Sequence, residues 1–210
     1  MEEIVMTPTF LRSQFSVTGY YGQVGQSPRR TVLDIKKNEY EGKSHDLMVI
    51  MMNPGSSSPQ GDWSESLNRS IPAHPDNTQY QIMRFMLRTD LKSARILNLS
   101  DIILTKSHSF YGEIDPDENK NPHSVFSNKR RKELDGLFIS DVPILLAWGV
   151  NDKLLPLINP AMKYLSIMRQ RCFGYLKPMS TDRFYHPLPP RTHLQEVWVT
   201  KCVESFTMKF

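Results

Sequence analysis

The chain has 210 residues, of which 39% are hydrophobic and 23% are charged. This length suits one well-buried domain, so we expect a single domain over residues 1–210. The composition excludes a disordered or collagen-like chain. No apolar run reaches the roughly 18 residues that a membrane helix needs. The N-terminal MEEIVMTPTF also lacks the basic and apolar regions of a secretory signal.

Charge and cysteine content narrow the class further. The formal net charge is +4, but residues 161–210 carry +5 and the first 160 residues carry −1. A basic C-terminal quarter suits a polyanion such as DNA, although charge alone favours an ordinary solvated surface. Cys172 and Cys202 are too few for a disulfide framework or a four-thiolate metal site. We therefore expect a reducing, cytoplasmic setting, with one disulfide left open.

Apolar segments of strand length alternate with segments of helical spacing along the chain. The strand-like segments are an N-terminal hairpin at about 15–36 and buried strands at 47–52, 94–100, 142–149 and 172–175. Helices are predicted at 78–90, 128–137, 150–170 (interrupted at Pro156 and Pro160) and about 193–209. The last helix is expected to bury Leu194, Val197, Trp198, Cys202, Val203 and Phe206. Two long polar stretches, 54–77 and 107–125, are predicted to be loops.

This alternation indicates the α/β class, as a three-layer α/β/α sandwich with a central, mainly parallel sheet. In such sheets a ligand binds beyond the carboxyl ends of the strands. The predicted strands end at Asn53, at Asn98 and at Trp148-Gly149, and His186 follows further along the chain. We therefore expect these breaks to meet at one edge of the sheet.

Three side chains at these breaks are candidates for chemistry. The amide of Asn53 can orient a water molecule, and the amide of Asn98 can pair with the polar edge of a nucleobase. His186, next to Pro187, can donate to an oxygen that becomes negative as a bond breaks. Each also has a structural explanation. Asn53 can simply form a turn, Asn98 can satisfy backbone groups at a strand end, and His186 can pack within a loop.

Other motifs bear on cofactors. The remaining histidines show no metal-ligand spacing, so we expect no metal. No glycine-rich dinucleotide or P-loop motif and no nucleophile elbow occurs, so we expect no cofactor. Among the aromatic residues, Tyr80 and Phe85 have the helical spacing of core residues. Trp63 lies in a polar loop, where we expect it to stack on a base.

Four segments between about residues 45 and 190 resemble, in order, the motifs of the uracil-DNA glycosylase superfamily. Residues 52–55 resemble the Asn-Pro-Gly loop of mismatch-specific uracil and thymine glycosylases, and 96–105 resemble the strand whose asparagine reads the base. Residues 145–149 are similar to a strand ending in Leu-Trp-Gly, and 185–189 resemble the His-Pro-Ser-Pro-Leu loop. The chain also resembles a bacterial family of unknown function, marked by Met-Asn-Pro-Ser-Thr-Ala-Asp and His-Pro-Leu.

The resemblance implies a uracil-DNA glycosylase-like fold and a monofunctional DNA glycosylase. Such an enzyme flips a uracil or 5-modified pyrimidine out of DNA and excises it by hydrolysis, leaving an abasic site. Asn53 would position water, Asn98 would read the base and His186 would donate to it. Gly55 stands where the uracil-strict branch has a tyrosine, which implies room for thymine or the modified cytosines of phage DNA. The role would be DNA repair or phage defence.

The same resemblance suggests the DNA contacts. Leu188 would be the wedge that fills the vacated stack. The phosphates would be held by Ser56, Ser57, Arg183 and Arg191, and the protein would act as a monomer. Two other functions remain open: a non-catalytic nucleic-acid-binding protein on the same fold, and a hydrolase of free nucleosides or nucleotides.

Overall fold

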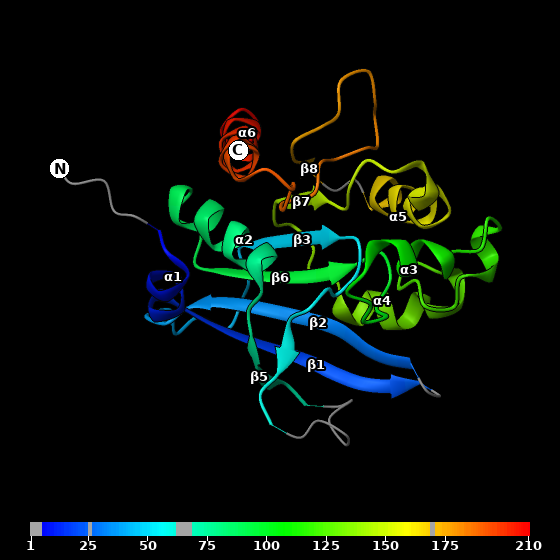
Figure 1. The fold of residues 1–210 in the computed structure, drawn as a ribbon, viewed down its shortest axis with the longest axis horizontal. Helices are drawn as coiled ribbons and strands as arrows, with labels where there is room; N and C mark the ends of the chain where they lie inside the picture. The colour runs from blue at the N-terminus through cyan, green and yellow to red at the C-terminus, as the bar shows by residue number, and fades with distance from the viewer. Residues whose placement is uncertain (1–5, 25–26, 62–68, 169–170) are drawn as a thin grey trace.

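The computed structural model describes residues 6–24, 27–61, 69–168 and 171–210. Its strands are β1 (Phe15–Val24), β2 (Ser27–Lys37), β3 (Leu47–Met51), β4 (Ser58–Pro59), β5 (Ile71–His74), β6 (Ser93–Asn98), β7 (Ile144–Ala147) and β8 (Cys172–Phe173). They form an eight-stranded sheet in the order β4-β5-β1-β2-β6-β3-β7-β8 (Figure 1). The predicted hairpin is confirmed as β1 and β2, and the four predicted buried strands are β3, β6, β7 and β8.

The sheet has a parallel half and an antiparallel half. Strands β6, β3, β7 and β8 pair in parallel. The β1–β2 hairpin is antiparallel and joins this half through the antiparallel pairing of β2 with β6. The sheet is therefore mixed, with the parallel strands at its core.

Helices cover both faces of the sheet. One face carries α1 (Pro8–Gln14), α2 (Asn77–Arg88) and α6 (Thr192–Thr207), and the other carries α3 (Ser107–Gly112), α4 (Arg131–Leu137) and α5 (Leu155–Ile167). The two groups of helices lie on opposite sides of Figure 1. Three short 3-10 turns, η1 (Glu118–Lys120), η2 (Asn128–Arg130) and η3 (Asp152–Leu154), join the second group. The predicted three-layer α/β/α arrangement is confirmed.

Strand β3 shows why the parallel strands consist of uninterrupted apolar residues. All five of its residues are buried. Leu47, Val49 and Met51 face the core under α1, α2 and α6, while Met48 and Ile50 face the core under α3, α4 and α5. A strand that is covered on both faces has no polar face to alternate with, so its sequence is apolar throughout.

Both predicted loops contain regular structure, so those two predictions are wrong in part. The stretch 54–77 includes β4 and β5, and the stretch 107–125 includes α3 and η1. Each of these elements is too short for its hydrophobic residues to show a helix or strand periodicity. In β5 only Ile71 and Ala73 are buried, and in α3 only Phe110 is buried. Packing of these few anchors, rather than a sequence pattern, orders the backbone.

The last two helices also differ from expectation. Helix α5 runs through Pro160 instead of stopping there, because burial of Leu157, Ile158 and Ala161 on its apolar face outweighs one lost backbone hydrogen bond. Pro156 lies in the first turn, where no donor is needed. Helix α6 buries Trp198, Val199 and Cys202, whereas Leu194 and Val197 are each 38% exposed.

Two further findings bear on the class of protein. Cys172 and Cys202 are free thiols, so the disulfide left open by the sequence is not formed. Within the described ranges, no helix combines the length and the apolar character that crossing a membrane requires.

The aromatic cluster between α2 and α6 gives a stability prediction. Phe85 is fully buried, with its ring centroid 5.6 Å from that of Phe173 and 5.8 Å from that of Phe206. We expect Phe85→Ala to lower the free energy of unfolding by about 3–5 kcal/mol, because it removes apolar contact and leaves a cavity. Urea denaturation measures this. The control Met179→Ala, at a fully exposed side chain, should change the value by less than about 0.5 kcal/mol.

A loss below about 1 kcal/mol for Phe85→Ala would contradict this assignment of the core.

Candidate active site

A cavity of about 520 Å³ lies beyond the carboxyl ends of β3 and β7. Among the described residues that line it there is one carboxylate, Asp76, one imidazole, His186, and no Lys or Arg. The remaining lining is neutral, with polar and apolar groups in similar measure. It comprises Met51, Met52, Asn53, Pro54, Gly55, Ser56, Pro75, Asn77, Thr78, Gln79, Tyr80, Leu104, Thr105, Ser107, Tyr111, Trp148, Gly149 and Leu188.

Asn53 directly follows β3 and is held by the neighbouring chain. Its Nδ2 donates to the carbonyl oxygen of Leu104 at 2.6 Å. No donor in the described part of the chain hydrogen-bonds to its Oδ1. Because Asn53 lines the cavity, that oxygen is available to accept a hydrogen bond from a water molecule.

Gly55 makes the turn that brings this loop against the start of α2. Its φ of +66° lies in the left-handed region, which residues with a Cβ rarely adopt. A Cβ at this position would also lie 3.1 Å from Oδ2 of Asp76. The backbone conformation and the close approach of Asp76 therefore both favour glycine here.

Asp76 is the one carboxylate in the described lining, and the sequence did not single it out. It is the N-cap of α2, and its Oδ1 accepts from the backbone N–H groups of Thr78 (2.8 Å) and Gln79 (3.3 Å). Its Oδ2 accepts from both the N–H and the hydroxyl of Ser56, each at 3.2 Å. Asp76 and Gln79 form a capping box. The spacing Asp-x-x-Gln before an apolar periodic segment is the signal that could have identified this residue.

His186 enters the cavity from a loop that is tied down on both sides. The N–H of Tyr185 donates to Tyr175 O, and Nε1 of Trp198 donates to Tyr185 O, both at 2.8 Å. The N–H of Leu188 donates to Nδ1 of His186 at 3.2 Å. A backbone N–H can only donate, so Nδ1 accepts and the neutral ring carries its proton on Nε2.

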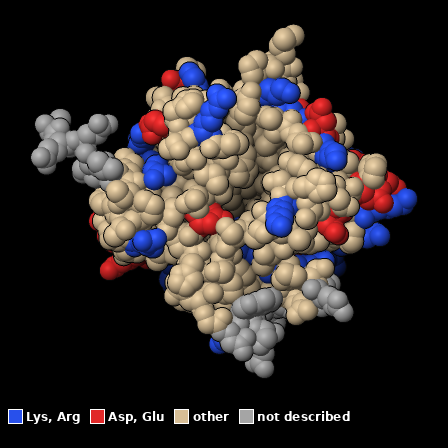
Figure 2. Space-filling model, viewed as in Figure 1, with Lys and Arg blue, Asp and Glu red and all other residues tan. Residues whose placement is uncertain are grey.

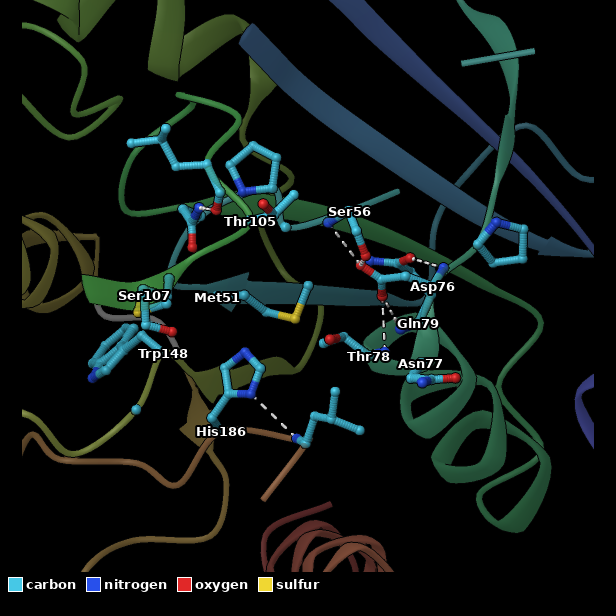
Figure 3. A pocket seen from close by; sticks show the side chains of 18 of the residues that line it. Met51, Ser56, Asp76, Asn77, Thr78, Gln79, Thr105, Ser107, Trp148 and His186 are labelled. Atoms are coloured by element: carbon cyan, nitrogen blue, oxygen red, sulfur yellow. Dashed lines mark hydrogen bonds between the residues drawn. The ribbon is translucent and has the colours of Figure 1, made fainter. Parts of the chain in front are cut away.

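Burial keeps the imidazole neutral. Protein surrounds the ring except where part of its surface faces the cavity, and this burial lowers the pKa of His186 to about 4. The negative charge of Asp76 acts in the opposite direction but is the smaller influence. Figure 3 shows His186 and Asp76 approaching the cavity from different sides. At neutral pH the cavity therefore offers an uncharged Nε2–H donor opposite a carboxylate.

Trp148 connects the end of β7 to the loop that carries His186. Its side chain is fully buried, and its Nε1 donates to Asp182 O at 2.9 Å. The N–H of Gly149 donates to Phe184 O at 2.8 Å. These two bonds fix the approach of residues 182–186 to the cavity.

Asn98 does not line the cavity with Asn53 and His186. It ends β6 with its side chain 2% exposed, and neither its Nδ2 nor its Oδ1 has a hydrogen-bond partner in the described ranges. Its parallel neighbour on β3, Met51, lines the cavity instead. The expectation that all three polar side chains share one cleft therefore holds for two of them, since β6 lies one strand further from the cavity than β3.

The structure separates the five predicted DNA-contact residues. Ser56 and Leu188 line the cavity, and Arg191 is exposed as the N-cap of α6. Ser57 is buried and donates its hydroxyl to His74 O at 3.0 Å. Arg183 is also buried, and its guanidinium pairs with Asp152 at 3.3 Å and Asp182 at 2.8 Å. Ser57 and Arg183 are therefore occupied with internal bonds and do not present free groups to a phosphate. Trp63, the predicted stacking residue, lies outside the described residues.

Some basic residues of the C-terminal quarter interact with neighbouring side chains of the protein. Lys201 pairs with Glu204 at 2.7 Å, and Arg171 lies over the ring of Phe210 at 4.7 Å. Figure 2 shows Lys and Arg side chains spread around a hollow in this face rather than gathered into a stripe. Part of the positive charge of residues 161–210 is therefore neutralised by acidic side chains nearby, as Lys201 is by Glu204.

Tyr111, from α3, is a second lining residue that the sequence did not indicate. Burial raises the pKa of its phenol, which also has Asn151 as a hydrogen-bond partner. No motif marks it, because α3 itself has no periodic pattern. In the described part of the chain, no three His, Cys, Asp or Glu side chains are grouped so as to hold a metal ion.

The turn at Gly55 gives a second prediction. We expect Gly55→Ala to lower the free energy of unfolding by about 1–2 kcal/mol from the left-handed φ, with a further loss from crowding against Asp76. Gly61→Ala is the matched control, because Gly61 has a φ of +84° and open space around its Cβ position. Urea denaturation of both variants isolates the contact with Asp76. Equal losses for the two variants would show that this contact has no energetic weight.

The buried imidazole gives a third prediction. Because the folded-state pKa of His186 is about 4 against an ordinary 6.5, the unfolded chain binds the extra proton between these pH values. Stability therefore falls as pH is lowered from 6.5 to 4, by about 2–3 kcal/mol from this residue. We expect His186→Gln to have a smaller loss over the same range, measured by urea denaturation at several pH values. His45 and His123, whose pKa values burial also lowers, contribute equally to both proteins. Equal losses of stability in the wild type and His186→Gln between pH 6.5 and 4 would contradict the lowered pKa of His186.

Comparison with known proteins gives a family and no function. No curated protein matches the chain, and no solved structure matches it. Residues 35–188 match the family described as "Protein of unknown function (DUF1643)". That range starts within β2 and includes the parallel strands, Asp76 and His186. It covers most of the sequence, and the chain therefore belongs to the DUF1643 family.

Proposed function

We propose that this protein is a DNA glycosylase, which hydrolyses the N-glycosidic bond of a pyrimidine nucleotide extruded from DNA and leaves an abasic site. The observation that carries the proposal is the pairing, in one cavity, of a neutral imidazole donor with an unpaired amide oxygen. The cavity volume of about 520 Å³ falls in the range typical of small-ligand sites. Extruding the base costs a few kcal/mol before chemistry begins.

In the proposed reaction the bond between C1′ of the sugar and N1 of the base breaks, and its electron pair leaves with the base. His186 donates a hydrogen bond from Nε2 to the base oxygen on which negative charge develops. Asn53 holds a water molecule through Oδ1, and the water oxygen forms the new bond to C1′. The proton released from the water ends on the departing base. The products are a free base and an abasic sugar with a hydroxyl at C1′.

The lining favours a pyrimidine with room at its 5-position. Gly55 lines the cavity without a side chain that would meet a substituent at the 5-position, which is compatible with uracil, thymine or a modified cytosine such as those of phage DNA. Asn77, Thr105 and Ser107 supply neutral donors and acceptors in the wall, in place of Asn98. The ring of Tyr111 offers a stacking surface. A role in repair or in phage defence would follow from which base is released.

DNA contacts are proposed at the mouth of the cavity. Leu188 lines the cavity and is followed three residues later by the exposed Arg191. Lys106, also exposed, lies between the lining residues Thr105 and Ser107. These two cations are the groups that we assign to the flanking phosphates.

Hydrolysis of a free nucleoside is a second candidate. Leu188 is partly buried in the cavity wall instead of projecting as a wedge, and the described lining has no Lys or Arg for a phosphate. Both observations suit a substrate without a duplex. Arg191→Ala separates the candidates, because Arg191 is exposed and outside the cavity lining: its loss should impair base release from DNA and leave nucleoside hydrolysis unchanged.

The fourth prediction tests catalysis directly. Duplexes that contain uracil, mismatched thymine or 5-hydroxymethylcytosine are incubated with the protein, and abasic sites are counted by alkaline strand cleavage. We expect His186→Ala to reduce the rate by about 10²–10³-fold, the effect of losing one preorganised donor. His193→Ala, at an exposed position in α6, is the control and should match the wild type.

Three results would redirect the assignment. Release from nucleosides alone favours the second candidate. DNA binding without any base release favours a non-catalytic binding protein. Equal rates for wild type and His186→Ala would remove His186 from the mechanism.

A further inference from the structure

The cavity is electrically asymmetric. Its described lining has one carboxylate, at Asp76, and no basic side chain to neutralise it from within. The neutral imidazole of His186 presents a hydrogen-bond donor from another side (Figure 3). A ligand in this cavity therefore meets a negative charge at the start of α2 and a donor at the His186 loop.

The hydrogen bonds of Asp76 fix where that negative charge lies. Two donors come from the first turn of α2 and two from Ser56, so each carboxylate oxygen accepts two bonds. A carboxylate has about four acceptor positions, and here all of them are filled. The group is therefore poorly suited to take a proton from water, but its charge is held in one place.

A buried arginine also interacts electrostatically with Asp76. Arg30, in β2, is fully buried beside Tyr21, and its positive charge interacts electrostatically with the negative charge of Asp76. Burial lowers the pKa of the guanidinium, and the charge of Asp76 opposes that effect. The carboxylate of Asp76 is thus held in place by its bonds from the first turn of α2 and from Ser56.

We propose that Asp76 is a catalytic residue, whose fixed carboxylate stabilises the positive charge that develops on the sugar as the bond to the base breaks. The inference rests on the proposed N-glycosidic cleavage. Breaking that bond leaves a cationic, oxocarbenium-like sugar and an anionic base. The cavity matches both charges: Asp76 faces the sugar and His186 faces the base. This pairing also sets the orientation of the substrate, with its sugar toward α2.

The fifth prediction uses a substitution that keeps the cap and removes the charge. Asparagine is as good an N-cap as aspartate, so Asp76→Asn should keep α2 intact. Its NH2 group cannot accept the two bonds from Ser56 that Oδ2 accepts, so the binding measurement below isolates the effect of the charge. We expect kcat for base release to fall by about 100-fold with little change in KM, because the lost interaction forms in the transition state. Asp76→Ser, which also caps helices, should show the same loss. Asp117→Asn is the matched control, since Asp117 caps η1 outside the cavity lining.

A binding measurement tests the charge without turnover. Duplexes that contain a protonated pyrrolidine analogue of the abasic sugar are compared with duplexes that contain the neutral tetrahydrofuran analogue, by fluorescence anisotropy. We expect wild type and Asp117→Asn to bind the cationic analogue about tenfold more tightly, and Asp76→Asn to bind both equally. An unchanged preference in Asp76→Asn, or no preference in wild type, would overturn the inference.

The two assays separate this inference from the proposed function. Base release by wild type and by Asp76→Asn at equal rates would leave the glycosylase standing and remove Asp76 from it. Absence of base release in wild type, together with an Asp76-dependent preference for the cationic analogue, would refute the glycosylase and keep the charge assignment.

Discussion

The four hydrogen bonds accepted by the carboxylate of Asp76 are the interactions on which the site depends most. This carboxylate joins the loop after β3 to the first turn of α2, through two bonds from Ser56 and two from the backbone of α2. The bond from Ser57 to His74 O and the pairing of β4 with β5 hold the same loop further along the chain. One side chain, that of Asp76, therefore caps a helix, shapes a turn and places a negative charge in the cavity.

The opposite wall is fixed by different means. The loop around His186 is held by backbone bonds to β7 and Tyr175 and by the indoles of Trp148 and Trp198. The bond from the N–H of Leu188 selects the tautomer, and burial keeps the ring neutral. Rigid anchoring of this kind limits the reorganisation that a reaction would require, which is the condition for strong electrostatic stabilisation of a transition state.

The cavity and the outer surface differ in charge. The described lining contains no Lys or Arg, whereas Lys106 and Arg191 are exposed near it. Several basic residues of the C-terminal quarter are engaged in local pairs, as Lys201 is with Glu204. A partner that is polyanionic outside the cavity and uncharged inside it suits this distribution better than a ligand whose phosphate must enter.

The sequence by itself determined the parallel strands of the core. Strands covered on both faces must be apolar throughout, so they can be recognised as apolar runs such as 47–52. It also located Asn53 and His186, since polar residues at strand ends and beside prolines stand out against apolar surroundings. Only the tertiary structure decided that Asn98 is set back from the cavity, that Arg183 is occupied by Asp152 and Asp182, and that Asp76 lines the cavity. Those outcomes depend on which strands are neighbours in the sheet and on how α2 packs against it. Such facts arise from packing between distant segments and leave no periodic trace in the chain.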